Sequence, residues 1–285
     1  MKNFSTENTS DSLRQLVRQG YAQIAKETST GCCGTGVSCC GSTPQEASKL
    51  ARELGYTVEE LQALPEGANM GLSCGNPAAL AALRPGETVL DLGSGGGFDI
   101  FIAGKKVGPT GRAIGVDMTP EMLAKARGNV AHYRRESGLD NAEFRLGEIE
   151  HLPVADHSVD VIISNCVINL SPDKAQVWRE VARVLKPGGR VAISDMALLK
   201  PLPEEVIKLV EARIGCVAGA VQVSETGRMV QEAGLTDIHL TPKAGYVEAL
   251  TDWEDPLYQK LIALLPAGAK PAEYIASVEV TARKP

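Results

Sequence analysis

The stretch VLDLGSGGGFDI, residues 89–100, joins a run of aliphatic residues to a glycine-rich turn. The run ends at Asp91, and four of the six residues that follow it are glycines, Gly93 and Gly95 among them. Glycines permit a tight turn and let the backbone approach a ligand closely, and a helix that starts after them presents free N–H groups. The stretch therefore predicts a strand, a ligand-binding turn and a helix, although a connection that is merely tight would use the same residues.

A second β-branched run, AIGVD, ends at Asp117, about 20 residues after Gly95. At that offset an acidic residue meets the ribose hydroxyls in nucleoside sites. The turn lacks the Lys-Ser/Thr ending of a triphosphate-binding loop, and its glycines do not have dinucleotide-site spacing. The two motifs together favour a cofactor that contains adenosine, whereas Asp117 alone could serve as the entry cap of a helix.

Short β-branched runs alternate with helical patterns from residue 88 to residue 195, which is typical of a parallel sheet covered by helices on both faces. We expect strands at 88–92, 113–117, 143–146, 159–164 and 190–195, with helices at 98–106, 120–137 and 173–185. Further helices are expected at 12–27, 43–55, 203–220 and 224–234, and closing strands at 237–242 and 274–285. This pattern predicts three parts: N-terminal helices with a cysteine-rich extension at 1–75, a Rossmann-like cofactor domain at 76–200, and a C-terminal cover at 201–285.

Composition excludes several classes of function. The chain has 285 residues and a net charge of −6, and its 29 basic residues are scattered, so we expect no nucleic-acid partner. The N-terminus has no apolar signal region and no window is apolar enough to span a membrane, which predicts a cytoplasmic protein without a membrane partner. Thiols stay reduced in the cytoplasm, so the seven cysteines indicate metal, metalloid or redox chemistry.

Four of these cysteines crowd into GCCGTGVSCCG, residues 31–41. Cys32, Cys33, Cys39 and Cys40 have only small residues around them, and no strand or helix pattern would hold them rigidly. One alternative is a protein that binds or sequesters soft metal ions through these thiolates. Adjacent cysteines point poorly at one tetrahedral centre, however, and the spacing is not that of known zinc sites. We therefore expect accessory thiols here.

The other three cysteines lie further along the chain. Cys166 follows the strand run VIISN, and ligands of parallel sheets bind outside the carboxyl ends of the strands. Cys74 lies in a segment rich in glycine and asparagine, and Cys216 lies within a helical pattern rich in small residues. Free cysteines are more often small buried hydrophobes than reactive groups, so core packing stays open for Cys166 and Cys216.

The motifs DLGSGGG, VDMT, GEIEHLP and LKPGGR resemble those of class I S-adenosylmethionine-dependent methyltransferases, from about residue 88 to residue 195. The resemblance implies that the glycine loop wraps the methionine part of S-adenosylmethionine, that the acid after the second strand holds the ribose, and that an Ile-Glu pair flanks adenine. The residues so implied are Asp91, Gly93, Ser94, Gly95, Asp117, Met118, Ile149, Glu150 and Asn165.

The segments GLSCGNP, SNCVINLSPDK and RIGCVAGA resemble the three cysteine motifs of arsenite S-adenosylmethionine methyltransferases over nearly the whole chain. The resemblance implies that the thiolates of Cys74, Cys166 and Cys216 hold trivalent arsenic, as arsenite or methylarsenite. Soft thiolates select soft centres, and the arsenic lone pair can attack a methyl carbon without a base. Methyl transfer oxidises arsenic; thiolates can return two electrons as a disulfide, which reduced thioredoxin or glutathione would reset.

A carbon or oxygen methyltransferase of a quinone-like small molecule is the alternative enzyme. The segments GEIEHLPVADHSVDVIIS and EVARVLKPGGR also occur in quinone-type methyltransferases. Such an enzyme does not require Cys166 or Cys216, and an oxygen acceptor would need a general base. The cysteine motifs favour arsenite methylation, with a role in arsenic detoxification.

Overall fold

The computed structural model describes the chain except for residues 1–9, 28–43, 210–215, 244 and 253–254. Its centre is a seven-stranded sheet of order β3-β2-β1-β4-β5-β7-β6. Strands β1 to β5 pair in parallel, and β7 runs antiparallel to both β5 and β6. The strands are β1 (Thr88–Leu92), β2 (Arg112–Asp117), β3 (Ala142–Leu146), β4 (Val159–Asn165), β5 (Leu185–Leu198), β6 (Thr236–Lys243) and β7 (Ile275–Arg283). The α/β fold predicted from the alternating pattern is confirmed, and each expected strand is present.

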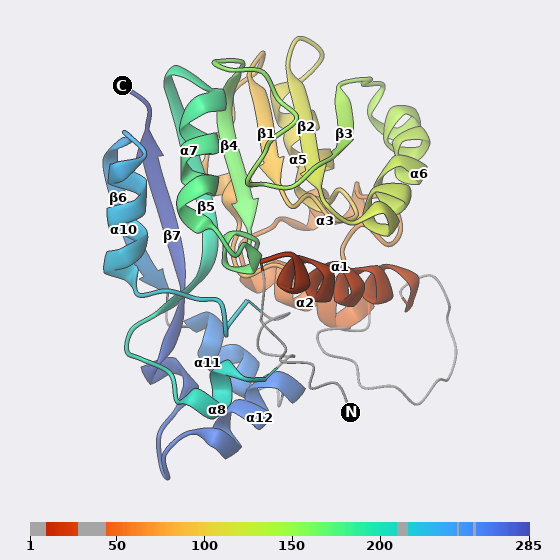
Figure 1. The fold of residues 1–285 in the computed structure, drawn as a ribbon. Coiled ribbons are helices and arrows are strands. Elements are labelled where there is room, and N and C mark those ends of the chain that lie inside the picture. The colour runs from red at the N-terminus through yellow and green to blue at the C-terminus, as the bar shows by residue number, and fades with distance from the viewer. Residues whose placement is uncertain (1–9, 28–43, 210–215, 244, 253–254) are drawn as a thin grey trace, which may run out of the picture.

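Helices cover both faces of this sheet because the central strands are apolar on both sides. One face packs against α7 (Lys174–Val184) and α10 (Val223–Glu232), with Trp178 fully buried between α7 and the strands. The other face packs against α5 (Phe98–Val107) and α6 (Pro120–Ser137) through Phe101 and Tyr133. In Figure 1, α7 lies in front of the sheet and α6 at its β3 edge.

The carboxyl ends of the parallel strands face a second set of helices (Figure 1). There α1 (Ser10–Glu27) passes beneath β1 to β4 and contacts α6. Helix α2 (Pro44–Glu53) lies beside it in Figure 1, whereas α3 (Val58–Gln62) is tied to α5 by the Glu60–Lys106 ion pair and α4 (Pro77–Leu80) packs on β4, β5 and α5. The C-terminal segment adds α8 (Glu204–Ile207), α11 (Gly245–Asp252) and α12 (Pro256–Leu264), and the short 3₁₀ turns are η1 (Ile168–Leu170) and η2 (Pro271–Glu273).

The C-terminal residues serve two different purposes. Strands β6 and β7 complete the main sheet, and helix α10 packs on it. Helices α8, α11 and α12 surround a separate apolar cluster at the carboxyl edge of the sheet. That cluster contains Cys74, Cys166 and Cys216 together with Met196 and Val217. The three cysteines therefore meet in a small core of their own.

The continuous helix expected at 203–220 is wrong. Outside residues 210–215, which are not described, the structure has α8 there, which ends at Ile207, and a turn at residues 216–219. Cys216 adopts a left-handed backbone with φ of 63°, which no α-helix accommodates, and Gly219 packs against the Asn169 carbonyl oxygen. Cys216 is therefore buried in a turn and not in a helix, and its place in the apolar cluster is compatible with the core-packing alternative.

Candidate active site

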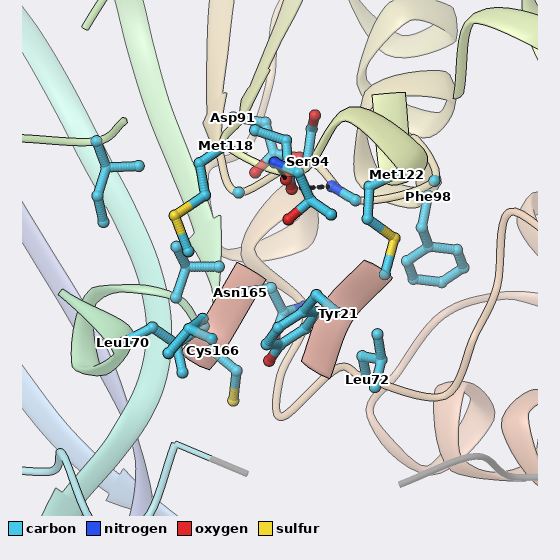
Figure 2. Close-up of a pocket in the computed structure, with 18 of the residues that line it drawn as sticks. Tyr21, Leu72, Asp91, Ser94, Phe98, Met118, Met122, Asn165, Cys166 and Leu170 are labelled. Carbon is cyan, nitrogen blue, oxygen red and sulfur yellow. Dashed lines mark hydrogen bonds between the residues drawn. The ribbon is translucent and has the colours of Figure 1, made fainter. Parts of the chain in front are cut away.

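An open cleft of about 1000 Å³, a volume that includes solvent at its mouth, lies at the carboxyl edge of the sheet. Its walls come from the β1–α5 turn, the ends of β2 and β4, and helix α1. Figure 2 shows Met118 and Met122 on two sides of the cleft, with Cys166 beside Leu170 at its lower edge. Ten residues implied by the sequence motifs line it: Asp91, Gly93, Ser94, Gly95, Asp117, Met118, Ile149, Glu150, Asn165 and Cys166.

The glycine-rich turn is tied to strand β2. The backbone N–H groups of Gly93 and Ser94 both donate to the Val116 carbonyl oxygen, at 2.8 and 3.0 Å. Gly93 has φ of 71°, and a Cβ atom built on it would lie 2.3 Å from a methyl carbon of Val167. A side chain at Gly93 would both strain the backbone and displace the residue after Cys166.

The Asp117 carboxylate fixes the same turn from the other side. Its Oδ2 accepts a hydrogen bond from the Gly95 N–H at 2.9 Å, and its Oδ1 accepts one from the Thr119 N–H at 2.8 Å. Burial raises the pKa of this carboxyl, and the backbone donors of Thr119 and Gly95 oppose that rise. Asp117 thus orders the loop and faces the cleft at the same time.

The buried carboxyl groups that line this cleft include those of Asp91, Asp99 and Asp117. Burial, with the charges of Asp99 and Asp117, raises the pKa of Asp91 well above its usual range. Burial also raises the pKa of Asp99 to about 6. A cationic ligand would stabilise the ionised forms of all three, so the cleft suits a positively charged molecule.

Sequence reasoning missed Asp99. It is the second residue of α5, directly after the glycine turn, where an acidic residue is ordinary because it complements the helix N-terminus. Its buried position, and the hydrogen bonds it accepts from Tyr56 at 2.7 Å and Asn165 at 3.3 Å, are visible only in the structure.

The three cysteines come from distant parts of the chain to one edge of this cleft. Cys74 and Cys166 form a disulfide, with their Cα atoms 6.1 Å apart. The Cys216 thiol donates to the Cys166 carbonyl oxygen at 2.7 Å. The ligand atoms of Cys166, Asp195 and Cys216 all lie within 4.8 Å of one another. Cys166 lines the cleft, while Cys74 and Cys216 lie behind it in the apolar cluster.

Known proteins are similar to this chain in both fold and sequence. Residues 83–234 match a methyltransferase domain family. The arsenite methyltransferase of Halobacterium salinarum is 48% identical over 278 residues, which are 95% of this chain and 66% of that protein. The arsenite methyltransferase of Aquipseudomonas alcaligenes is 42% identical over 183 residues, which are 63% of this chain and 52% of that protein. The arsenic(III) S-adenosylmethionine methyltransferase of Chlamydomonas reinhardtii superposes with a TM-score of 0.59 at 31% identity, covering 85% of this chain and 74% of that one.

The chain belongs to the arsenite methyltransferase family. The aligned part spans between about half and two thirds of the length of the two curated relatives.

Helix α1 brings a basic side chain to the cofactor side of this arsenite methyltransferase fold. Arg14 lines the cleft, and its guanidinium lies 3.4 Å from the Glu150 carboxylate and 3.5 Å from that of Glu148. The Ser171 hydroxyl donates to the same Glu150 carboxylate at 2.7 Å. Arg14 and Tyr21 were not among the predicted site residues, because an amphipathic helix pattern does not reveal what the helix covers.

Two of the three cysteines predicted to bind arsenic have an unusual backbone. Cys166 has φ of 54° and Cys216 has φ of 63°. Residues other than glycine rarely adopt this left-handed conformation, and it concentrates at functional sites. The remaining predicted thiols, Cys32, Cys33, Cys39 and Cys40, lie outside the described residues. Within the part of the chain that the structure covers, no helix has the length and apolar character of a membrane span.

Proposed function

We propose that this chain transfers methyl groups from S-adenosylmethionine to trivalent arsenic bound by Cys74, Cys166 and Cys216. The observation that carries the proposal is the meeting of these three cysteines at one edge of a cleft that suits a nucleoside cation. Arsenite and methylarsenite are the proposed substrates, and the product is a methylated arsenical.

The cleft fits the cofactor on two counts. The turn around Gly95 is ordered by Asp117, whose carboxylate faces the cleft as a ribose acceptor should. The buried carboxyl groups of Asp91 and Asp99 complement a molecule with a sulfonium and an ammonium group. Glu150 and Ile149 would flank the adenosine part. When bound, S-adenosylmethionine supplies an electrophilic methyl group to the arsenic lone pair.

The protein's part in the transfer is to hold and dehydrate the arsenic. Soft thiolates bind trivalent arsenic in preference to hard ions. The cysteines lie among the apolar side chains of Met196, Val217 and Leu170, which limit the access of water. No general base is required, because arsenic attacks through a lone pair rather than through an O–H bond.

The disulfide supports a second role for two of the ligands. Methyl transfer takes arsenic from the trivalent to the pentavalent state, and two thiolates that form a disulfide return the two electrons. Cys74 and Cys166 already pair in this structure, so they are the proposed donors. An external thiol, reduced thioredoxin or glutathione, then regenerates both thiols by exchange. This chemistry needs a reducing compartment, which favours the cytoplasm.

The loop thiols Cys32, Cys33, Cys39 and Cys40 are proposed as accessories. They would capture arsenite, deliver it to the rigid site, or exchange disulfides with Cys74. They are not required to hold methylarsenite, which offers two exchangeable positions and needs two thiols.

The test is arsenic speciation after incubation of the reduced protein with S-adenosylmethionine, a thiol and either arsenite or methylarsenite. We expect Cys166→Ser and Cys216→Ser to abolish turnover of both substrates, because a hydroxyl stays protonated and binds arsenic weakly. Cys74→Ser should lose arsenite turnover, which needs a third thiolate, and retain methylarsenite turnover, because the added thiol can return the two electrons in place of Cys74. The variant with all four loop cysteines changed to Ser should show the same split, more mildly.

Three results would contradict the proposal. Wild-type protein that binds S-adenosylmethionine but leaves both arsenicals unmethylated would favour a carbon or oxygen methyltransferase. Protein that binds arsenic or zinc without binding the cofactor would favour a soft-metal-binding protein. Full arsenite turnover by Cys166→Ser would remove this cysteine from the arsenic site.

A further inference from the structure

The side-chain amide of Asn165 holds the backbone on both sides of Cys74. Its Oδ1 accepts a hydrogen bond from the Cys74 N–H at 2.9 Å, and its Nδ2 donates to the Gly75 carbonyl oxygen at 2.9 Å. Asn165 is the last residue of β4 and directly precedes Cys166. One side chain therefore fixes Cys74 beside the residue with which it forms a disulfide.

The same amide also belongs to the cofactor cleft. Asn165 and Asp99 both line the cleft, and the Asn165 Nδ2 lies 3.3 Å from the Asp99 carboxylate. The Tyr56 hydroxyl donates to Asp99 at 2.7 Å and lies 3.2 Å from the Gly75 carbonyl oxygen. Asp99, Tyr56 and Asn165 thus form one polar network between the cleft and the Cys74 backbone.

A second anchor holds Cys74 from outside the cleft. The buried Ser277 hydroxyl, on β7, donates to the Cys74 carbonyl oxygen at 2.7 Å. Gly75 packs so closely on Ser194 that an added Cβ atom would lie 2.3 Å from the Ser194 hydroxyl oxygen. Cys74 is therefore fixed by strands of the sheet, although it precedes all of them in sequence.

We propose that Asn165 is a positioning residue for the Cys74 thiol, in addition to its expected place beside the cofactor, and that it joins the Cys74–Cys166 pair to the cofactor cleft. The equilibrium constant for forming a disulfide between two thiols increases when the fold holds the two thiols close together. Loss of the amide removes its hydrogen bonds to the Cys74 N–H and the Gly75 carbonyl oxygen, leaves the Ser277 contact in place, and weakens the pairing. That the Cys74–Cys166 pair serves methyl transfer rests on the proposed function, but the positioning of Cys74 by Asn165 does not.

The experiment measures the equilibrium between protein dithiol plus oxidised glutathione and protein disulfide plus two reduced glutathione molecules. It uses the full chain with Cys32, Cys33, Cys39, Cys40 and Cys216 changed to Ser, so that only one disulfide can form. S-Adenosylmethionine binding to the same proteins is measured by calorimetry. Neither readout involves arsenic or methyl transfer, so failure here leaves the proposed function standing, and the reverse also holds.

We expect Asn165→Ala to lower the equilibrium constant for disulfide formation at least tenfold, which corresponds to about 30 mV for two electrons, and to weaken cofactor binding. Ser277→Ala should lower the same constant without changing cofactor affinity, since Ser277 does not line the cleft. If Asn165→Ala does not fold, Asn165→Asp is the second variant, because it keeps an acceptor for the Cys74 N–H and loses the donor to Gly75.

Asn141→Ala is the matched control. Its amide also donates to two backbone carbonyl oxygens, of Gly104 and Gly108, and accepts from a tyrosine hydroxyl, that of Tyr133, away from the cleft. This control should lower thermal stability and leave both the disulfide constant and cofactor affinity unchanged. A disulfide constant that stays within twofold of wild type in the folded Asn165 variant would overturn the proposal, as would an equal shift in the Asn141 control.

Discussion

Replacement of Asp117 by alanine tests whether this carboxylate acts as both the loop anchor and the ribose acceptor. The substitution leaves the Gly95 and Thr119 N–H groups without their acceptor. Both residues border the cleft, but Thr119 is only 2% exposed, so water replaces its lost partner less readily than that of Gly95. An unsatisfied buried donor costs about 1–3 kcal/mol, so we expect the free energy of unfolding to fall by roughly that amount.

Cofactor binding should fall by a separate amount. Hydrogen bonds to a charged group contribute about 1.5–3 kcal/mol, which is a loss of roughly 10- to 150-fold in affinity. Calorimetric titration of S-adenosylmethionine measures the affinity, and urea unfolding without cofactor measures the stability. The two numbers separate the loop-ordering role from the binding role.

Asp160→Ala is the matched control for Asp117→Ala. Asp160 also accepts a backbone hydrogen bond, from the Thr88 N–H at 2.8 Å, and it pairs with Lys186 at the opposite end of β1 and β4. We expect this variant to lose stability and keep its cofactor affinity. If Asp117→Ala bound S-adenosylmethionine within twofold of wild type, the assignment of this acid to the ribose would be wrong.

Two further predictions concern the surroundings of the thiols. Burial raises the pKa of Asp195 to about 6. Between about pH 4 and pH 6 the folded chain therefore keeps a proton on Asp195 that the unfolded chain releases. The wild type loses stability as the pH rises through that window. Asp195→Asn should remove this component, on the order of 3 kcal/mol, from the pH dependence of urea unfolding in the arsenic-free protein; parallel profiles for the two proteins would contradict it. Gly219→Ala places a Cβ atom 2.1 Å from the Asn169 carbonyl oxygen, so the turn that carries Cys216 must shift. We expect a loss of about 1–3 kcal/mol and faster reaction of Cys216 with a thiol reagent, whereas Gly128→Ala, which meets nothing within 4 Å, should show neither change.

The sheet could be predicted from sequence because each of its central strands is a short β-branched run that ends at a turn or polar residue. Asp117 and Asn165 end such runs and Asp91 is the second-to-last residue of its run, and the carboxyl ends of parallel strands share an edge, so their convergence follows from topology. The register that places Cys166 on the same edge follows for the same reason. This part of the site depends on local pattern and on one rule about parallel sheets.

The rest depends on contacts between residues far apart in the chain. Nothing in the local sequence indicates that Ser277 binds the Cys74 carbonyl, 203 residues away, or that Arg14 reaches Glu150. The pattern at 203–220 carried a helical signal, but the turn at Cys216 packs against Cys166 and Asn169 and has a left-handed backbone at Cys216. Tertiary packing overrides local propensity there, which is why the helix was wrongly predicted.

The left-handed backbone at Cys166 and Cys216 has a consequence for engineering this protein. At such positions the chain itself favours glycine or asparagine, and other residues are disfavoured by roughly 1–2 kcal/mol. A library of variants sorted for expression or heat resistance under reducing conditions, where Cys166 makes no disulfide, would therefore reward replacement of the two thiols, and stabilised scaffolds derived from it would lose their proposed arsenic ligands first. Sorting in the presence of arsenite, with survival as the criterion, would oppose that drift and keep cysteine at both positions.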